Sequence, residues 1–179
     1  DRAPVAGRLA TKGAADHRPS WVSRKGGDQT AYWHEKMRES EASQDLFEAS
    51  VRGDMKAAML ALVAHGNPNC CNADGLTALM AAAAGGHLEL VRLLVTSGAK
   101  VNAAPCPWGL SPLSLAAAQG GLEVVNLLLQ WKAEPNTGTA SGNAALSRAA
   151  AAGHTQTIVA LLQTGADIDA CGGGRPRPR

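Results

Sequence analysis

Aromatic side chains are scarce in this chain of 179 residues, which holds one Tyr, one Phe and four Trp. A buried core must therefore come from Ala, Leu and Val, a composition that suits thin helices packed closely in pairs. The chain also lacks any apolar run near the ~18 residues that a membrane-spanning helix requires. These absences argue against a membrane span and favour a small helical fold.

A zinc-binding pattern is missing from the four cysteines. They are Cys70, Cys71, Cys106 and Cys171, and no C-x-x-C pair or matching His pair accompanies them. We interpret them as free thiols, which predicts an intracellular, reducing compartment. The first residue is Asp, at a processed or a trimmed start. The basic, acid-poor beginning resembles the segment downstream of a cleaved transit peptide, so a mitochondrion or chloroplast stays open as the location.

Motifs of catalysis and cofactor binding are missing as well. No G-x-S-x-G, H-E-x-x-H, Walker or dinucleotide fingerprint is present. The Gly-Gly pairs at 85 and 120 lie between predicted helices, and we interpret them as turns. His87 and His154 recur at one repeat position, where we expect a structural role in capping a helix and bonding to backbone. The sequence thus predicts no enzyme, no metal site and no cofactor.

Charge is present but unevenly placed around the formal net charge of +2. Residues 45 to 171 carry six basic and nine acidic side chains, whereas residues 1 to 25 carry six basic and two acidic ones. The last eight residues add Arg175, Arg177 and Arg179. The middle of the chain is therefore mildly acidic, and both of its ends are basic.

The most informative feature that is present is a repeat. Related stretches begin at Gly75, Gly109 and Gly142, with offsets of 34 and 33 residues. Each holds a small-residue helix, a Gly turn and a Leu/Val-rich helix, and a fixed period of this length is typical of a stacked solenoid. An earlier helix, turn and helix from Asp45 to Gly66 fits the same layout. The predicted units span 45–72, 73–104, 105–138 and 139–171.

These units resemble ankyrin repeats, whose first helix opens with T-P-L-H-x-A. The matching stretches begin at Thr77, Ser111 and Ala144, the turn appears as Gly86-His87 and Gly153-His154, and closing segments end at Asn69, Asn102, Asn136 and Asp169. The resemblance implies an all-α ankyrin-repeat solenoid of about four helix-turn-helix units with an extended N-terminal arm. No unit keeps the signature His, so its hydrogen bonds must be replaced or lost. The first unit is one residue longer between its turn and Gly66, which fits an N-terminal cap.

In that family the loop tips and the exposed side of the first helices form a concave binding surface, which implies a protein-interaction module. Trp108 is the principal candidate contact, because Trp is over-represented at interface hot spots. Packing of Trp108 on Pro105 or Pro107 is the alternative. The predicted partner-binding residues are Asp74, Leu76, Pro107, Trp108, Leu110, Ser141 and Asn143.

The segments outside the repeats suggest further contacts. Residues 1–28 are predicted to be an extended basic arm, residues 29–44 a short linker helix with Thr30 as its N-cap, and residues 172–179 a flexible Gly/Arg/Pro tail. Aromatic and basic side chains there suit a protein groove or nucleic acid. The alternative function is a structural accessory subunit of a large, organellar or RNA-containing assembly. Its contacts would be Trp21, Tyr32, Trp33, Arg175, Arg177 and Arg179.

Overall fold

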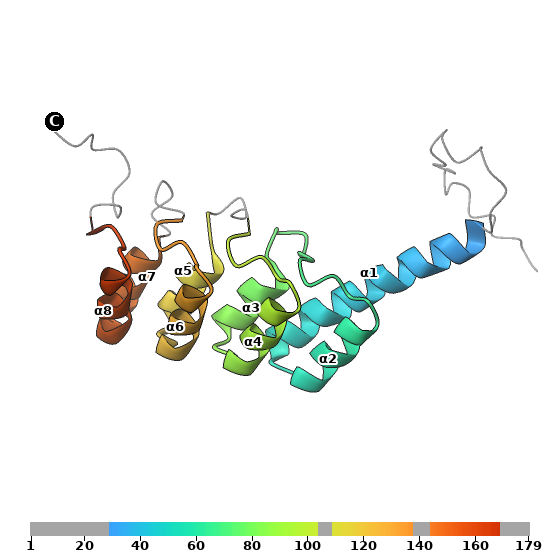
Figure 1. Cartoon of the computed structure of the whole chain (residues 1–179), viewed down its shortest axis with the longest axis horizontal. Coiled ribbons are helices and arrows are strands. Elements are labelled where there is room, and N and C mark those ends of the chain that lie inside the picture. Colours follow the sequence, from blue (N-terminus) through green and yellow to red (C-terminus); the bar gives the residue numbers. More distant parts are fainter. Residues whose placement is uncertain (1–28, 104–108, 138–143, 169–179) are drawn as a thin grey trace, which may run out of the picture.

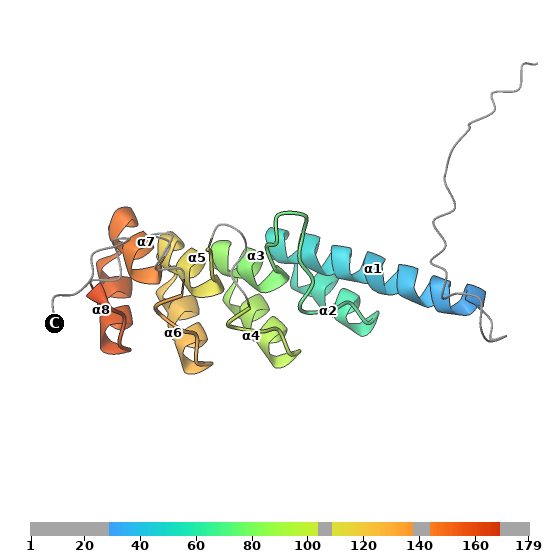
Figure 2. The ribbon, with the colours of Figure 1, turned by 90° about the horizontal axis from the view of Figure 1, so that it is seen from above.

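The computed structural model describes residues 29–103, 109–137 and 144–168, with side chains from Ser40 onward. Eight helices lie in these ranges, with no strand beyond one isolated bridge. They form two rows, and the loops between successive pairs project from one edge of the stack (Figures 1 and 2). The helices are α1 (Gln29–Arg52), α2 (Met55–Val63), α3 (Ala78–Ala84), α4 (Leu88–Thr96), α5 (Pro112–Gln119), α6 (Leu122–Gln130), α7 (Ala145–Ala152) and α8 (Thr155–Gln163).

The first helix differs from the prediction. We expected a linker helix over 29–44 and a separate helix from Asp45, but α1 is continuous from Gln29 to Arg52. Between Ser43 and Leu46 the chain has neither Gly nor Pro, so nothing ends the helix before Gly53, which has φ of 75°. Thr30 lies inside the helix instead of capping it. The helix therefore joins the predicted linker to the repeats without a hinge.

The two rows of helices contribute side chains of different size to the core. The inner row, α1, α3, α5 and α7, packs each helix on the next, and its buried side chains are mostly Ala. The outer row supplies larger side chains, among them Leu90, Leu94, Val125 and Leu128. Small inner residues let helix axes approach, while Leu and Val fill the space between pairs. This confirms the predicted all-α repeat solenoid.

His87 and His154, which follow the turn glycines of their own units, each pack against the turn glycine of the preceding unit. A Cβ added at Gly53 would lie 2.5 Å from the ring of His87, and one at Gly120 would lie 2.5 Å from the ring of His154. His154 Nε2 also lies 3.1 Å from the carbonyl oxygen of Ala118. Neither side chain caps its own helix, but the bond of His154 to a carbonyl in the last turn of α5 confirms the expected contact with backbone for this residue. The third unit has Gly121 at this position, and a Cβ on Gly86 would meet nothing within 4 Å.

The hydrogen bonds of the missing signature His are replaced in one unit and lost in another. Ser111 and Ser114 form a reciprocal capping box at the start of α5, with bonds of 2.9 and 3.1 Å. In α7 the equivalent pair is Ala144 and Ser147. Ala144 offers no side-chain cap, and Ser147 Oγ is buried without a hydrogen-bond partner. The missing hydroxyl of residue 144 therefore leaves the N-terminus of α7 without a side-chain cap.

Replacing Ala144 with Ser is expected to raise the free energy of unfolding by about 1 kcal/mol, because Ser is a preferred N-cap. The new hydroxyl would accept from the backbone N–H of Ser147, as Ser111 Oγ accepts from Ser114 N at 3.1 Å. Urea unfolding at constant m value measures this gain. The matched control repeats Ala144→Ser in a Ser147→Ala background, where the gain should be the same because the cap accepts from the backbone N–H of residue 147. An unchanged midpoint in Ala144→Ser would contradict the capping-box assignment.

Asparagines near the ends of three units form hydrogen bonds to the backbone of the next unit. We call each pair of these bonds an asparagine clamp. Asn69 Oδ1 accepts from Lys100 N at 2.8 Å, and its Nδ2 donates to Gly98 O at 3.2 Å. Asn102 holds the backbone of Lys132 and Glu134 in the same way, with both distances at 2.9 Å. Asn136 continues the series with Asp167 N at 2.9 Å and Gly165 O at 3.5 Å. Each Asn thus fixes the next unit's loop from a distance of about one repeat along the chain.

The first unit is not longer than the others, contrary to the prediction. Gly66 N donates to Ala61 O, and Ala99 N donates to Leu94 O in the same pattern. Gly66 therefore corresponds to Ala99, while His65 occupies the left-handed position of Gly98, with φ values of 63° and 94°. Lys132 occupies this position in the third unit, with φ of 60°. The sequence had aligned Gly66 with Gly98, because Gly is usual at the left-handed position. The structure has His65 at that position, so the alignment shifts by one residue.

Candidate protein interface beside the first loop

The loop between α2 and α3 is held in shape by its own hydrogen bonds. Cys71 and Thr77 form an antiparallel bridge across it. Asn72 Oδ1 accepts from the backbone N–H groups of Asp74 and Leu76, at 3.0 and 2.9 Å. An Asx arrangement of this kind fixes a turn without burying it. These contacts therefore hold the tip of the loop in a defined conformation.

The tip carries the first two predicted contact residues. Asp74 is exposed at its end, and Asn72 Nδ2 donates to Asp74 Oδ2 at 3.2 Å. Leu76 is half-buried beside it. A carboxylate held by a neighbour and next to an apolar side chain offers a small mixed surface. The contact role of both residues stays a prediction.

A cleft of about 510 Å³ lies between α1 and this loop; we call it the loop cleft. Phe47 is half-buried in it and occupies the repeat position of Met80 and Ser114. Sequence reasoning did not select Phe47, although an aromatic side chain where other units carry Met or Ser was the available signal. The lining residues are Ser40, Ser43, Gln44, Phe47, Glu48, Cys70, Cys71, Asn72 and Ala73.

Ser43 ties the floor of the loop cleft to the loop. Its hydroxyl accepts from Asn67 N at 3.0 Å, and its carbonyl accepts from the Cys70 thiol at 3.1 Å. Burial, with a smaller contribution from Cys71, raises the pKa of the Cys70 thiol above its ordinary value, although a backbone hydrogen bond opposes this. Cys70 therefore remains a thiol donor at neutral pH. Both Cys70 and Cys71 are free cysteines, as expected.

The remaining predicted contacts are only partly placed. Leu110 is half-buried just before Ser111, which caps α5. Tyr32 and Trp33 lie in α1, with side chains outside the described part. Other predicted contacts fall outside the described residues altogether: Pro107, Trp108, Ser141, Asn143, Trp21, Arg175, Arg177 and Arg179. The loop cleft is thus the candidate site whose geometry is defined.

The described ranges contain neither a candidate metal site nor a candidate membrane span. No group of three or more His, Cys, Asp or Glu side chains is arranged there to hold a metal ion. Of the helices α1 to α8, none has the length and apolar character needed to cross a bilayer.

Comparison with known families gives two matches. A sequence model described as ankyrin repeats, in three copies, matches residues 46–139, and one described as an ankyrin repeat matches residues 141–173. A search of curated proteins finds no significant match. The matched ranges contain every helix from α2 to α8 and residues 46–52 of α1.

Proposed function

Since the chain belongs to the ankyrin repeat family, whose repeats are generally protein–protein interaction modules, we propose that it is a non-enzymatic module that binds a protein partner. The partner is held by the concave face and loop tips of the repeats. The observation that carries this proposal is the loop cleft, which is lined by the aromatic side chain of Phe47 from α1 and by a hydrogen-bonded loop.

The loop cleft has the chemistry of a protein interface. Phe47 offers a large apolar contact, and polar groups from Ser40, Gln44 and Asn72 surround it. Interfaces commonly place an apolar anchor inside a polar rim, and the anchor supplies most of the affinity. Because Ser43 fixes the loop to α1, little ordering entropy opposes binding. We propose that an apolar side chain of the partner enters here.

The partner's contact extends along the edge of the stack from which the loops project (Figure 1). Asp74 and Leu76 lie on the first of these loops, and Trp108 with Leu110 belongs to the next connection along the chain. Pro107, Ser141 and Asn143 complete the proposed surface. Trp108 is the proposed hot spot, and Phe47 is a second anchor.

Replacing Trp108 with Ala is expected to weaken partner binding about 30-fold, equivalent to about 2 kcal/mol for a hot-spot residue. Phe47→Ala should weaken it about 10-fold. Affinity purification from the native source with mass spectrometry identifies the partner, and titration then measures both affinities. The matched control is Asn126→Ala, on the exposed surface of α6. A change below about 0.5 kcal/mol for Trp108→Ala, with an unaltered melting curve, would contradict the hot spot.

A second candidate function is a structural accessory subunit of a larger assembly. The observation that favours it is the N-terminal part of α1, which runs on beyond the packed pairs as an unbroken helix (Figure 1). Such a helix could carry the basic arm away from the repeats to a neighbouring subunit or RNA. The same purification separates the two functions. A binding module keeps its partner when residues 1–39 are removed, whereas an arm-anchored subunit loses it.

A further inference from the structure

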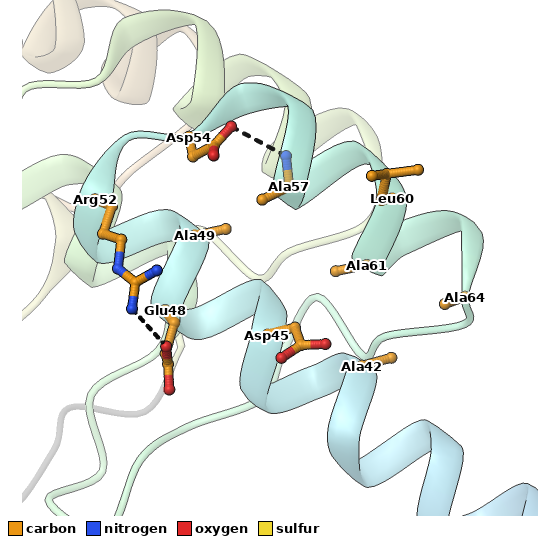
Figure 3. A pocket seen from close by; sticks show the side chains of 10 residues that line it. All are labelled: Ala42, Asp45, Glu48, Ala49, Arg52, Asp54, Ala57, Leu60, Ala61 and Ala64. Atoms are coloured by element: carbon orange, nitrogen blue, oxygen red, sulfur yellow. Dashed lines mark hydrogen bonds and ion pairs between the residues drawn. The ribbon is translucent and has the colours of Figure 1, made fainter.

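A second concavity, which we call the end groove, lies between α1 and α2 (Figure 3). It encloses about 360 Å³. Its floor consists of small residues, with Leu60 exposed at 70% beside them. Three carboxylates and one guanidinium stand around the floor. The lining residues are Ala42, Asp45, Glu48, Ala49, Arg52, Asp54, Ala57, Leu60, Ala61 and Ala64.

The end groove is the surface that a preceding helix pair covers elsewhere in the stack. Aligned on the turn glycines, Leu60 corresponds to Leu93 and Leu127, which are half-buried and buried. Ala57 corresponds to Leu90 and Val124, both buried between pairs. No helix pair precedes α1 and α2 within the described part of the chain. The groove exists because Ala57 is small where the inner units carry Leu or Val.

The charges of the end groove disfavour two possible occupants, which are another stacked repeat and a second copy of the chain. Asp45 holds the position of Ala78, Pro112 and Ala145, all of which are buried. Another repeat stacked here would bury the Asp45 carboxylate, at a high desolvation cost. The same face of a second copy would place Asp45, Glu48 and Asp54 against identical charges. The groove therefore favours an occupant with positive charge.

Two of the three carboxylates, those of Glu48 and Asp54, are held in place by hydrogen bonds and keep free acceptor capacity. Glu48 Oε2 accepts from Arg52 at 2.9 Å, which leaves its other oxygen. Asp54 Oδ1 accepts from the N–H groups of Lys56 and Ala57 at 3.0 and 3.1 Å, which leaves Oδ2. Each carboxylate can accept several hydrogen bonds, so a basic side chain can add to these. The rim is thus a preformed acceptor set above an apolar floor.

We propose that the chain's own basic arm, residues 1–28, binds in the end groove. Its first 25 residues hold six Arg and Lys with two Asp, and apolar residues such as Val5 and Leu9 lie between them. Basic side chains would meet the carboxylate rim, and apolar ones would cover Leu60 and the alanine floor. This inference does not depend on the loop cleft or its partner.

The covalent connection makes the arm the nearest basic segment. From Gln29 to Arg52, α1 extends about 35 Å at 1.5 Å per residue. An extended arm of 28 residues spans up to about 90 Å, so it can turn back along α1 and reach the whole groove. The other basic segment, residues 172–179, follows α8 at the opposite end of the stack (Figure 1). Tethering also raises the arm's effective concentration at the groove.

Zero-length carbodiimide cross-linking of the full chain tests this proposal. Lys12 of the arm should join to Asp45, Glu48 or Asp54, identified by mass spectrometry. Two variants should each reduce this product at least five-fold: Asp45→Lys, which reverses a rim charge, and Ala57→Leu, which fills the groove with the residue found at Leu90. Glu123→Lys, at an exposed position in the first turn of α6, is the matched control and should leave the yield unchanged.

The experiment also separates other occupants. Mixing isotopically light and heavy chains shows whether Lys12 joins to its own copy, and cross-links between copies would overturn the intramolecular assignment. Absence of the Lys12 product, or an equal spread of Lys12 products over Glu89 and Glu123, would overturn it too. Melting curves of both variants show whether the repeats remain folded. A folded Ala57→Leu variant with an undiminished yield counts against the groove even where Asp45→Lys is destabilised.

Discussion

Replacing Gly120 with Ala is expected to lower the free energy of unfolding by about 3 kcal/mol, through two separate costs. Gly120 has φ of 75°, a conformation that costs an L-residue about 1 kcal/mol. The new Cβ would also lie 2.5 to 2.7 Å from three ring atoms of His154. Such overpacking costs about 1 to 3 kcal/mol. The ring cannot move away freely, because His154 Nε2 interacts with Ala118 O at 3.1 Å.

Gly86→Ala is the matched control for this prediction. Its φ of 71° gives the same backbone cost, but a Cβ there meets nothing within 4 Å. Urea unfolding should therefore show a loss of about 1 kcal/mol for Gly86→Ala, and the excess in Gly120→Ala isolates the steric cost. Adding His154→Ala to Gly120→Ala should cost less than the two single losses combined. Equal losses of unfolding free energy in the two glycine variants would show that the His154 ring does not pack tightly against Gly120.

The same histidines illustrate how far the sequence predicts the fold. The repeat period, the Gly turns and the split between Ala-rich and Leu/Val-rich helices all follow from local patterns, and the structure confirms the solenoid. The recurrence of His87 and His154 was also visible and was correctly interpreted as structural. Their actual contact, on the turn glycine of the preceding unit, joins residues 34 apart and cannot be read from either helix alone.

Two local errors had a common origin. α1 continues through the predicted boundary at residue 44 because neither Gly nor Pro is present there to end it. The first unit was predicted to be one residue longer because the left-handed position was assigned to Gly66, whereas His65 supplies it. In both cases the end of a helix was inferred from the type of residue in the sequence. The backbone dihedral angles, which side-chain type only biases, decide where a helix ends.

The candidate site was less predictable than the fold. Asp74 and Leu76 could be assigned to a loop tip from the repeat register alone. The loop cleft could not, because it forms only when the hydrogen bonds from Asn67 and Cys70 to Ser43 bring the loop against α1. Phe47 is conspicuous only after that contact is known. The loop cleft forms where non-repeating residues meet across units, which is beyond the range of local patterns.

Asn102 provides the second large expected effect, because it carries two hydrogen bonds across a central interface. Asn102→Ala should lower the free energy of unfolding by about 2 kcal/mol, at roughly 1 kcal/mol for each net bond. The bonds lost are those to Lys132 O and from Glu134 N, both 2.9 Å. Asn136→Ala is the matched comparison and should cost less, since its bond to Gly165 O is longer at 3.5 Å. Urea unfolding measures both losses.

Amide hydrogen exchange locates the effect. In Asn102→Ala the Glu134 N–H loses its acceptor and should exchange at least ten-fold faster, while the Asp167 N–H, bound to Asn136 Oδ1, should be nearly unchanged. Asn136→Ala should give the reverse result. Because each repeat contacts only its neighbours, a broken clamp weakens one interface first and reaches the rest of the stack through lost coupling. Uniform acceleration of exchange in both variants would contradict the clamp, since it would show that neither Asn acts at its own interface.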